Sequence, residues 1–140
     1  MSPSTKLAAL LGILLLLNVP LLAQKNNDPS TKSVKKMKQV LIDQLTVPAN
    51  VKDSFIQRMN INRALIKQLP GFVKDEVYER QDENGNSIFV TVATWENEDL
   101  FKKAKQSVDL EYKRTGFNPI EFCQKLNIKI ERSIYQLREN

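Results

Sequence analysis

The clearest alternation of apolar and polar positions in the chain lies in residues 87–99. Two sets of apolar side chains alternate there along a predicted strand, Ile88, Val90 and Val92 on one face and Phe89, Ala93 and Trp95 on the other. A strand that is apolar on both faces must be covered from both sides. Asn97 is a good helix N-cap, and the two acidic residues after it favour the first turn of a helix. The pattern therefore predicts a doubly covered strand that leads directly into a helix.

Similar patterns predict the other elements on either side of this strand. Strands are expected over 37–47, 72–80 and 127–137, and helices over 50–69, 97–115 and in a short segment from residue 118. Asn50 is the expected N-cap of the first helix, and Asn84-Gly85 suits a type I′ hairpin turn. The order β-α-β-β-α-(α)-β is that of split βαβ units. We therefore predict an α+β, ferredoxin-like fold with a four-stranded antiparallel sheet.

The two longer helices of such a fold cover one face of the sheet only. The other face of the strand at 87–95 remains too apolar to face water. A second copy of the same sheet is the most economical cover. We therefore expect a homodimer whose sheets face each other, which is the arrangement of a dimeric α/β barrel.

Residues 1–23 have the pattern of a secretory signal peptide. Lys6 follows the amino terminus, residues 7–17 are apolar and uncharged, and Ala23 is a small residue at the expected cleavage site. We expect export, to the periplasm or the medium, after cleavage near Ala23. The alternative is an uncleaved anchor, although the apolar run is shorter than the ~20 residues of a spanning helix. This segment is the only expected contact with a membrane.

The polar and basic residues 24–36 are predicted to form a flexible linker, which leaves 37–140 as the folded domain. The formal net charge is +5, and much of the excess lies in this linker. No basic helix face or aromatic–basic platform is present in the sequence, so we expect no binding of nucleic acid.

The chain has no histidine and a single cysteine, Cys123. These counts exclude an intramolecular disulfide, a histidine-bearing metal site, and a Ser-His or Cys-His nucleophile pair. No set of metal ligands is predicted.

Seven short segments stand in a fixed order along the chain. They are I-D-Q-L-T-V-P at 42–48, N-I-N-R at 60–63, L-P-G-F at 69–72, V-Y-E-R at 77–80, T-V-A-T-W-E-N-E at 91–98, E-Y-K-R-T-G-F-N-P-I-E-F at 111–122, and E-R-S-I-Y at 131–135. Each segment alone is a weak motif, but the ordered set is fairly specific for a fold. On these segments the chain resembles the antibiotic biosynthesis monooxygenase (ABM) family of dimeric α/β-barrel proteins.

The resemblance implies two hypotheses about function. The family contains cofactor-independent monooxygenases acting on quinols and polyketide aromatics, haem-degrading enzymes, and members without known activity. The first hypothesis is a monooxygenase that needs no cofactor and oxidises a small aromatic or quinol-type substrate with dioxygen. The alternative is a non-catalytic dimeric module that binds a small hydrophobic ligand. The haem-degrading relatives use a first-strand asparagine and a histidine, whereas this chain has Asp43 and no histidine.

Three residues are candidates for catalysis. Trp95 matches the tryptophan that lines the pocket in the family's oxygenases, and the alternative is a plain core aromatic. Asp43 lies among apolar residues, where a carboxylate is either an acid–base group or one half of an ion pair. Arg132 is the natural partner for that pair. Asn62, in the middle of an apolar helix stripe, either offers its amide to a substrate oxygen or is satisfied by nearby backbone.

Trp95, Tyr78 and Arg132 are the predicted substrate-binding residues. Tyr78 and Tyr135 either line the cavity or pack on the sheet. A third hypothesis is a barrel filled with side chains, in which the domain serves only to dimerise.

Overall fold

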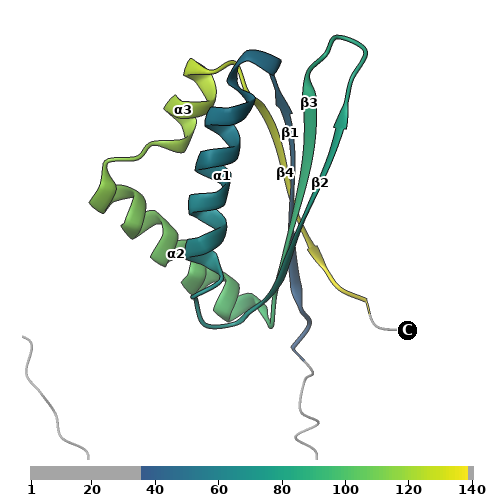
Figure 1. Cartoon of the computed structure of the whole chain (residues 1–140). Helices are drawn as coiled ribbons and strands as arrows, with labels where there is room; N and C mark the ends of the chain where they lie inside the picture. The colour runs from purple at the N-terminus through teal and green to yellow at the C-terminus, as the bar shows by residue number, and fades with distance from the viewer. Residues whose placement is uncertain (1–35, 139–140) are drawn as a thin grey trace, which may run out of the picture. The chain divides into compact units, whose positions relative to one another are not determined.

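Within residues 36–138, which the structure describes, four strands and three α-helices follow the predicted order (Figure 1). In this computed structural model the elements are β1 (Gln39–Val47), a 3-10 turn (Ala49–Val51), α1 (Lys52–Ile66), β2 (Phe72–Gln81), β3 (Ser87–Trp95), α2 (Glu98–Thr115), α3 (Pro119–Lys125) and β4 (Lys129–Gln136). The signal peptide predicted over 1–23, and all but the last residue of the linker predicted over 24–36, lie outside the described residues. That last residue, Lys36, forms an exposed ion pair with Asp99 in the first turn of α2.

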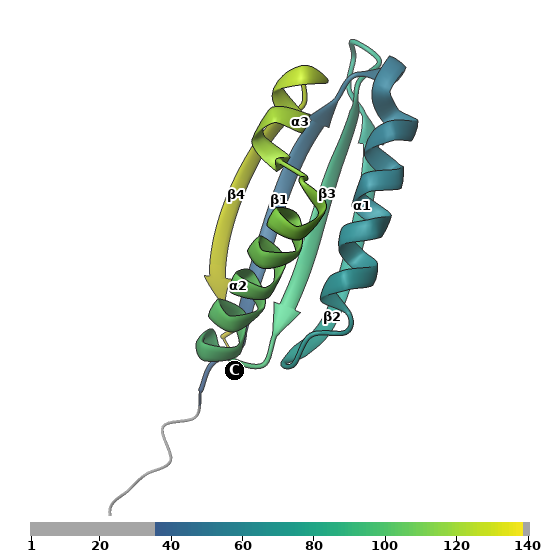
Figure 2. The ribbon, with the colours of Figure 1, turned by 90° about the vertical axis from the view of Figure 1, so that its left-hand side faces the viewer.

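The four strands form one antiparallel sheet in the order β2-β3-β1-β4. The three helices lie on one face of this sheet (Figure 2). The α+β, ferredoxin-like fold class predicted from the sequence is thus confirmed, with β1 and β3 at the centre and β2 and β4 at the edges.

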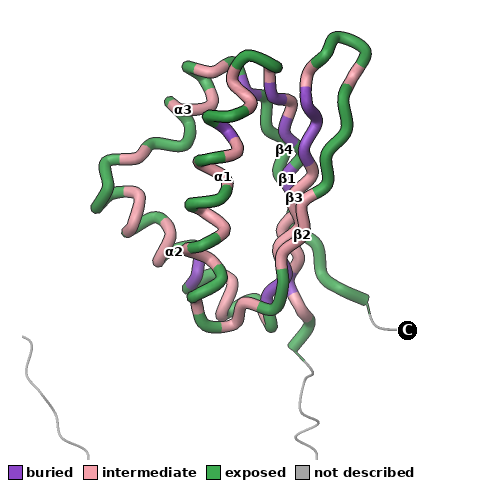
Figure 3. The backbone as a smooth tube through the Cα atoms, viewed as in Figure 1, coloured by how far each residue is buried: buried purple, intermediate pink, exposed green. Residues whose placement is uncertain are grey.

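The buried residues lie mainly on the two central strands (Figure 3). The core cluster consists of Leu45, Val47, Phe55, Phe89 and Ile128. Val47, at the end of β1, is fully buried. This core therefore joins the end of β1 and the start of β3 to α1 and to the segment that leads into β4.

Two helix starts follow the sequence prediction. The side chain of Asn97 accepts a hydrogen bond from the backbone N–H of Leu100 at 3.0 Å. The side chain of Asn118 accepts hydrogen bonds from the backbone N–H groups of Ile120 and Glu121 at the start of α3. Each cap satisfies backbone donors that have no partner inside the helix.

The predicted cap of the first helix, Asn50, is wrong. The carbonyl of Pro48 accepts a hydrogen bond from the N–H of Val51, which closes a 3-10 turn that contains Asn50. The helix α1 then begins at Lys52, after a residue that makes no side-chain cap. A turn that already satisfies the backbone leaves the Asn50 side chain no capping role.

The predicted type I′ turn at Asn84-Gly85 is also wrong. A type I′ turn needs a positive φ at both central residues, but of these two only Gly85 has one (81°). The Asp82 side chain accepts hydrogen bonds from the backbone N–H groups of Asn84 and Asn86, at 2.9 and 2.8 Å. These Asx-type bonds support a turn in which only Gly85 adopts the left-handed conformation.

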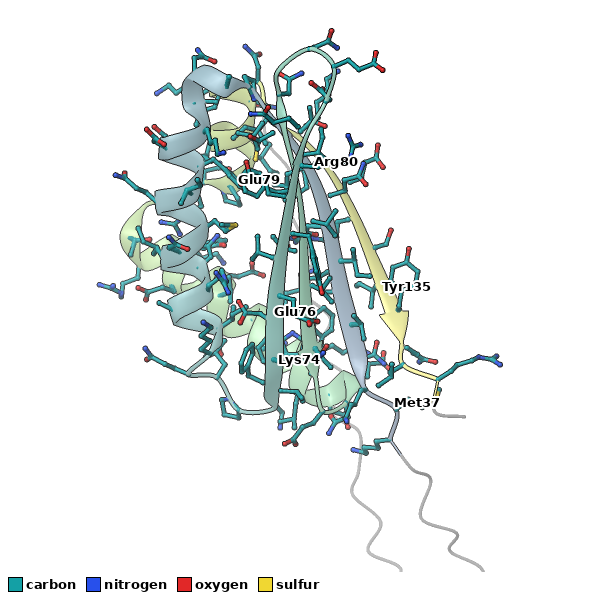
Figure 4. All side chains as sticks on the ribbon, turned by 45° about the vertical axis from the view of Figure 1, so that its right-hand side comes forward. Met37, Lys74, Glu76, Glu79, Arg80 and Tyr135 are labelled. Carbon is teal, nitrogen blue, oxygen red and sulfur yellow. The ribbon has the colours of Figure 1, made fainter. Side chains whose placement is uncertain are left out.

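Side chains on the outer face of the sheet point away from the described helices. Val40 and Ile42 of β1 and Ile88, Val90 and Val92 of β3 alternate with the helix-facing residues and form the apolar centre of this face. Lys74, Glu76 and Arg80 on edge strand β2 and Tyr135 on edge strand β4 lie along its two sides (Figure 4). We call this surface the outer sheet face.

Gly71 lies where the chain enters β2 close to α2, and it should be more sensitive to substitution than Gly85. Both glycines have φ above +80°, so alanine at either position should cost about 1–2 kcal/mol. A Cβ at Gly71 would also lie 2.5 Å from the Cβ of Leu100, whereas a Cβ at Gly85 meets nothing within 4 Å. We expect Gly71→Ala to lower the free energy of unfolding in urea by about 1–3 kcal/mol more than Gly85→Ala. Equal losses would contradict the close approach of Gly71 to α2.

Candidate functional site

A cavity of about 330 Å³ lies between the helix-facing side of the sheet and the three helices. Its aromatic lining consists of Phe55, Trp95, Phe101, Tyr112, Phe117 and Phe122. Ligand-binding pockets have volumes of roughly 300–1,000 Å³ and mostly apolar walls with a few polar groups. The cavity thus has the size and lining for a small aromatic molecule.

Trp95 occupies one end of this cavity, at the end of β3. Its ring packs edge-on against Phe72 at a centroid distance of 5.7 Å, and it contacts Phe101 at 6.3 Å. Only 3% of the residue is exposed, and its indole Nε1 has no hydrogen-bond partner among the described residues. A buried donor without a partner costs about 1–3 kcal/mol, so a ligand oxygen that reached this N–H would relieve that cost.

Asp43 and Arg132 form a bidentate ion pair on the cavity wall. They lie directly opposite each other on β1 and β4, and Nε and Nη2 of Arg132 each donate to one carboxylate oxygen of Asp43 at 2.7 Å. These hydrogen bonds raise the pKa of the Arg132 guanidinium. The ion pair considered in the sequence analysis is therefore present, and both oxygens of Asp43 already accept a hydrogen bond.

Asn62 lies on α1, one turn after Arg58, and both residues line the cavity. The amide oxygen of Asn62 accepts a hydrogen bond from Nη2 of Arg58 at 2.9 Å. The partner of that oxygen is therefore a side chain and not nearby backbone. The guanidinium of Arg58 in turn stacks on the ring of Phe117, with its central carbon 3.4 Å from the ring centroid.

The structure does not bring Tyr78 to this cavity. Val77 faces the helices and lines it, so the next residue along β2 points to the outer sheet face, where Tyr78 is 56% exposed. Tyr135 on β4 is exposed on the same outer face. The alternation of side chains along a strand thus corrects the prediction that Tyr78 binds substrate in the cavity, and of the two alternatives for Tyr135 it leaves the sheet surface.

Sequence reasoning did not single out several residues of the cavity lining, among them Arg58, Tyr112 and Cys123. Burial raises the pKa of the Tyr112 phenol, and the neighbouring Arg58 and Arg132 partly oppose that shift. Burial also raises the pKa of the Cys123 thiol. The position of Arg58 was available as a signal, because residues 58 and 62 lie one turn apart on the same side of a helix.

Among residues 36–138, no group of three or more His, Cys, Asp or Glu side chains is placed to hold a metal ion. None of the helices in that range has the length and apolar character that a membrane crossing requires.

Solved structures share this architecture at low sequence identity. A candidate monooxygenase from Shewanella loihica PV-4 is 20% identical, with a TM-score of 0.55 over 74% of this chain and 97% of that chain. A variant of SnoaB, a cofactor-independent oxygenase from Streptomyces nogalater, is 19% identical, with a TM-score of 0.53 over 74% and 96%. A dimeric ferredoxin-like protein from an uncultured marine organism is 13% identical, with a TM-score of 0.53 over 75% and 99%.

The chain has the antibiotic biosynthesis monooxygenase fold. This confirms the resemblance drawn from the seven sequence segments at the level of the fold. No protein-family model matches the sequence, and no curated protein does either.

Cys123 gives a direct measure of how the cavity shields its lining. Because its pKa is raised, a smaller fraction of the thiol is ionised at about pH 8 than in a free cysteine. We expect iodoacetamide to alkylate the native protein more slowly than the urea-unfolded protein at that pH, and the native rate to rise as the pH increases. Mass spectrometry can follow the reaction without ambiguity, since the chain has one cysteine. Equal rates in the native and unfolded protein would show that the thiol is not shielded.

Proposed function

We propose that the cavity binds a small aromatic or quinol-type molecule and that the protein oxidises it with dioxygen as a cofactor-independent monooxygenase. The observation that carries this proposal is the indole N–H of Trp95, which has no partner within residues 36–138 and is buried at the end of a cavity with aromatic walls. SnoaB, which has the same fold, is a cofactor-independent oxygenase. This likeness agrees with the proposal, but at 19% identity it concerns the fold alone.

The proposed reaction draws its electrons from the substrate itself. A phenol, quinol or anthrone bound in the cavity loses a proton to give an electron-rich anion, which transfers an electron to dioxygen. Combination of the two radicals forms a carbon–oxygen bond, and loss of water completes the oxidation. For anthrone, one oxygen atom of dioxygen enters the ring carbon as a carbonyl, the other leaves as water, and the product is anthraquinone.

Three polar groups of the cavity have a role in this proposal. The N–H of Trp95 donates to the substrate oxygen on which negative charge develops, which is the kind of stabilisation that lowers a barrier most. The amide nitrogen of Asn62 is a second donor, because only its oxygen is engaged by Arg58. Asp43 accepts the substrate proton only where Arg132 releases one carboxylate oxygen.

The need for Arg132 to release Asp43 favours a second candidate function, a non-catalytic module that binds a small hydrophobic ligand. Both carboxylate oxygens of Asp43 already accept a hydrogen bond from Arg132, so a substrate proton competes with a bidentate ion pair for them. A protein that only binds its ligand has no need of that base.

The proposal includes a homodimer formed through the outer sheet faces. The apolar centre of that face is not covered by any described helix, and charged side chains lie beside it on β2. One structure of this fold is described as dimeric. Export after cleavage near Ala23 is also part of the proposal, and it rests on the sequence of residues 1–23 alone.

Anthrone oxidation in aerated buffer tests the activity. We expect oxygen uptake and anthraquinone formation in equal amounts, at a rate proportional to protein concentration. Trp95→Phe keeps an aromatic ring but removes the N–H, and it should lower kcat by about 10²-fold. Ile120→Ala, at an exposed position of α3, is the control and should leave the rate unchanged.

Saturable binding of anthrone without turnover would overturn the oxygenase and support the binding module. Neither binding nor turnover would overturn both functions.

Sedimentation velocity tests the dimer. The wild-type protein should sediment at twice the mass of one chain. Val90→Asp places a charge in the apolar centre of the outer sheet face and should yield monomers, because an unpaired charge is costly to bury. The control Ile120→Asp introduces the same charge on α3 and should remain dimeric. Circular dichroism checks that both variants are folded, and a folded Val90→Asp dimer would contradict the proposed interface.

A further inference from the structure

Arg58 is the arginine of the cavity wall that lacks a carboxylate partner among the described residues. Arg132 pairs with Asp43, and Arg63 pairs with Asp75, which Lys67 also contacts. Asp109 of α2 lines the cavity too, but no ion pair joins it to Arg58. Within residues 36–138 the wall thus contains one guanidinium without a direct carboxylate contact.

The hydrogen bonds of this guanidinium are also incomplete. An arginine has five N–H donors, and Arg58 uses one of its Nη atoms to bind Asn62. Its Nε atom is buried and has no hydrogen-bond partner among residues 36–138. A half-buried cation with an unmet donor is costly, so the site favours a ligand that supplies negative charge and acceptor atoms.

Two aromatic rings hold the guanidinium in a defined orientation. Its central carbon lies 3.4 Å from the ring centroid of Phe117 and 5.3 Å from that of Tyr112. Stacking on a ring face directs the edge of the planar group away from the ring. This edge, of which Nη2 also binds Asn62, is the part that binds a carboxylate through two parallel hydrogen bonds. The packing therefore prepares Arg58 to receive an anionic oxygen in the plane of its guanidinium.

The guanidinium of Arg58 and the indole of Trp95 lie at different ends of the cavity. Trp95 contacts Phe101 near the start of α2, whereas Arg58 lies over Tyr112 near its end, about 16 Å further along the helix axis. The cavity is thus polarised, with a neutral donor at one end and a cation at the other.

We propose that Arg58 binds an acidic oxygen of the ligand and that the cavity selects aromatic anions, such as aromatic carboxylates, over neutral molecules of the same shape. This inference deepens the proposed function, since it rests on the cavity being the ligand site. It adds the class of ligand and the residue that selects it.

Isothermal titration calorimetry with two probes of one shape tests the selection. Naphthoate carries a carboxylate where naphthalenemethanol carries a neutral hydroxymethyl group. We expect the full-length protein to bind naphthoate at least about 10-fold more tightly, in line with charge-assisted hydrogen bonds being stronger than neutral ones. Arg58→Met keeps an unbranched apolar stem, and it should abolish this preference while the affinity for naphthalenemethanol changes little.

Arg114→Met is the matched control. It removes the same charge from an exposed position of α2, where Arg114 pairs with Glu111 outside the cavity lining, and the preference should persist. If Arg58→Met fails to fold, Arg58→Lys takes its place. The lysine variant keeps the charge without the planar fork, so naphthoate should bind several-fold more weakly and naphthalenemethanol as before.

Equal affinity of the wild-type protein for both probes, or a preference that survives in a folded Arg58 variant, would overturn this inference and leave the proposed function standing. Binding of neither probe would overturn it as well. The anthrone experiment decides the proposed function separately, because it measures oxidation, whereas the calorimetry measures only the preference for a negative charge.

Discussion

The pairing of β1 with β3 determines which side chains of this domain face the helices and which face outward. The register sets Leu41 opposite Ala93, Asp43 opposite Thr91, and Leu45 opposite Phe89, all on the helix-facing side. A shift by one residue would exchange the two faces of a strand. The core cluster, the cavity wall and the apolar outer sheet face all depend on this one register.

Alternation along the strands and the asparagine caps made most of the fold predictable from the sequence. These signals are local, and they depend on a few residues such as Asn97 and Asn118, whose side chains bind the next turn of backbone. The two wrong local predictions concern asparagines whose expected role was displaced by another hydrogen bond nearby. At Asn50 a 3-10 turn closed by Pro48 satisfied the backbone first, and at Asn84 the side chain of Asp82 favoured a turn with a single left-handed residue.

The candidate site was predictable in part for a similar reason. Asp43, Asn62, Trp95 and Arg132 lie on faces that periodicity places inward, and all four line the cavity. Tyr78 was misplaced because it neighbours an inward-facing residue on a strand. The position of Arg58, one turn before Asn62, was a signal but not a sufficient one, since a long arginine side chain can bury its stem and still extend its charge into water. The hydrogen bond to Asn62 and the stacking on Phe117 show that this arginine turns inward.

The separation between core and cavity wall has a consequence for how such a protein changes over generations. The edge strand β4 supplies Ile130, Arg132 and Ile134 to the cavity, yet all of its residues are exposed and none belongs to the core cluster. Substitutions of Ile130 and Ile134 alter the shape of the ligand site while the packing of the core cluster stays intact, whereas a change of Arg132 would leave Asp43 unpaired. Ligand preference in this chain can therefore drift by single mutations that selection for stability does not remove.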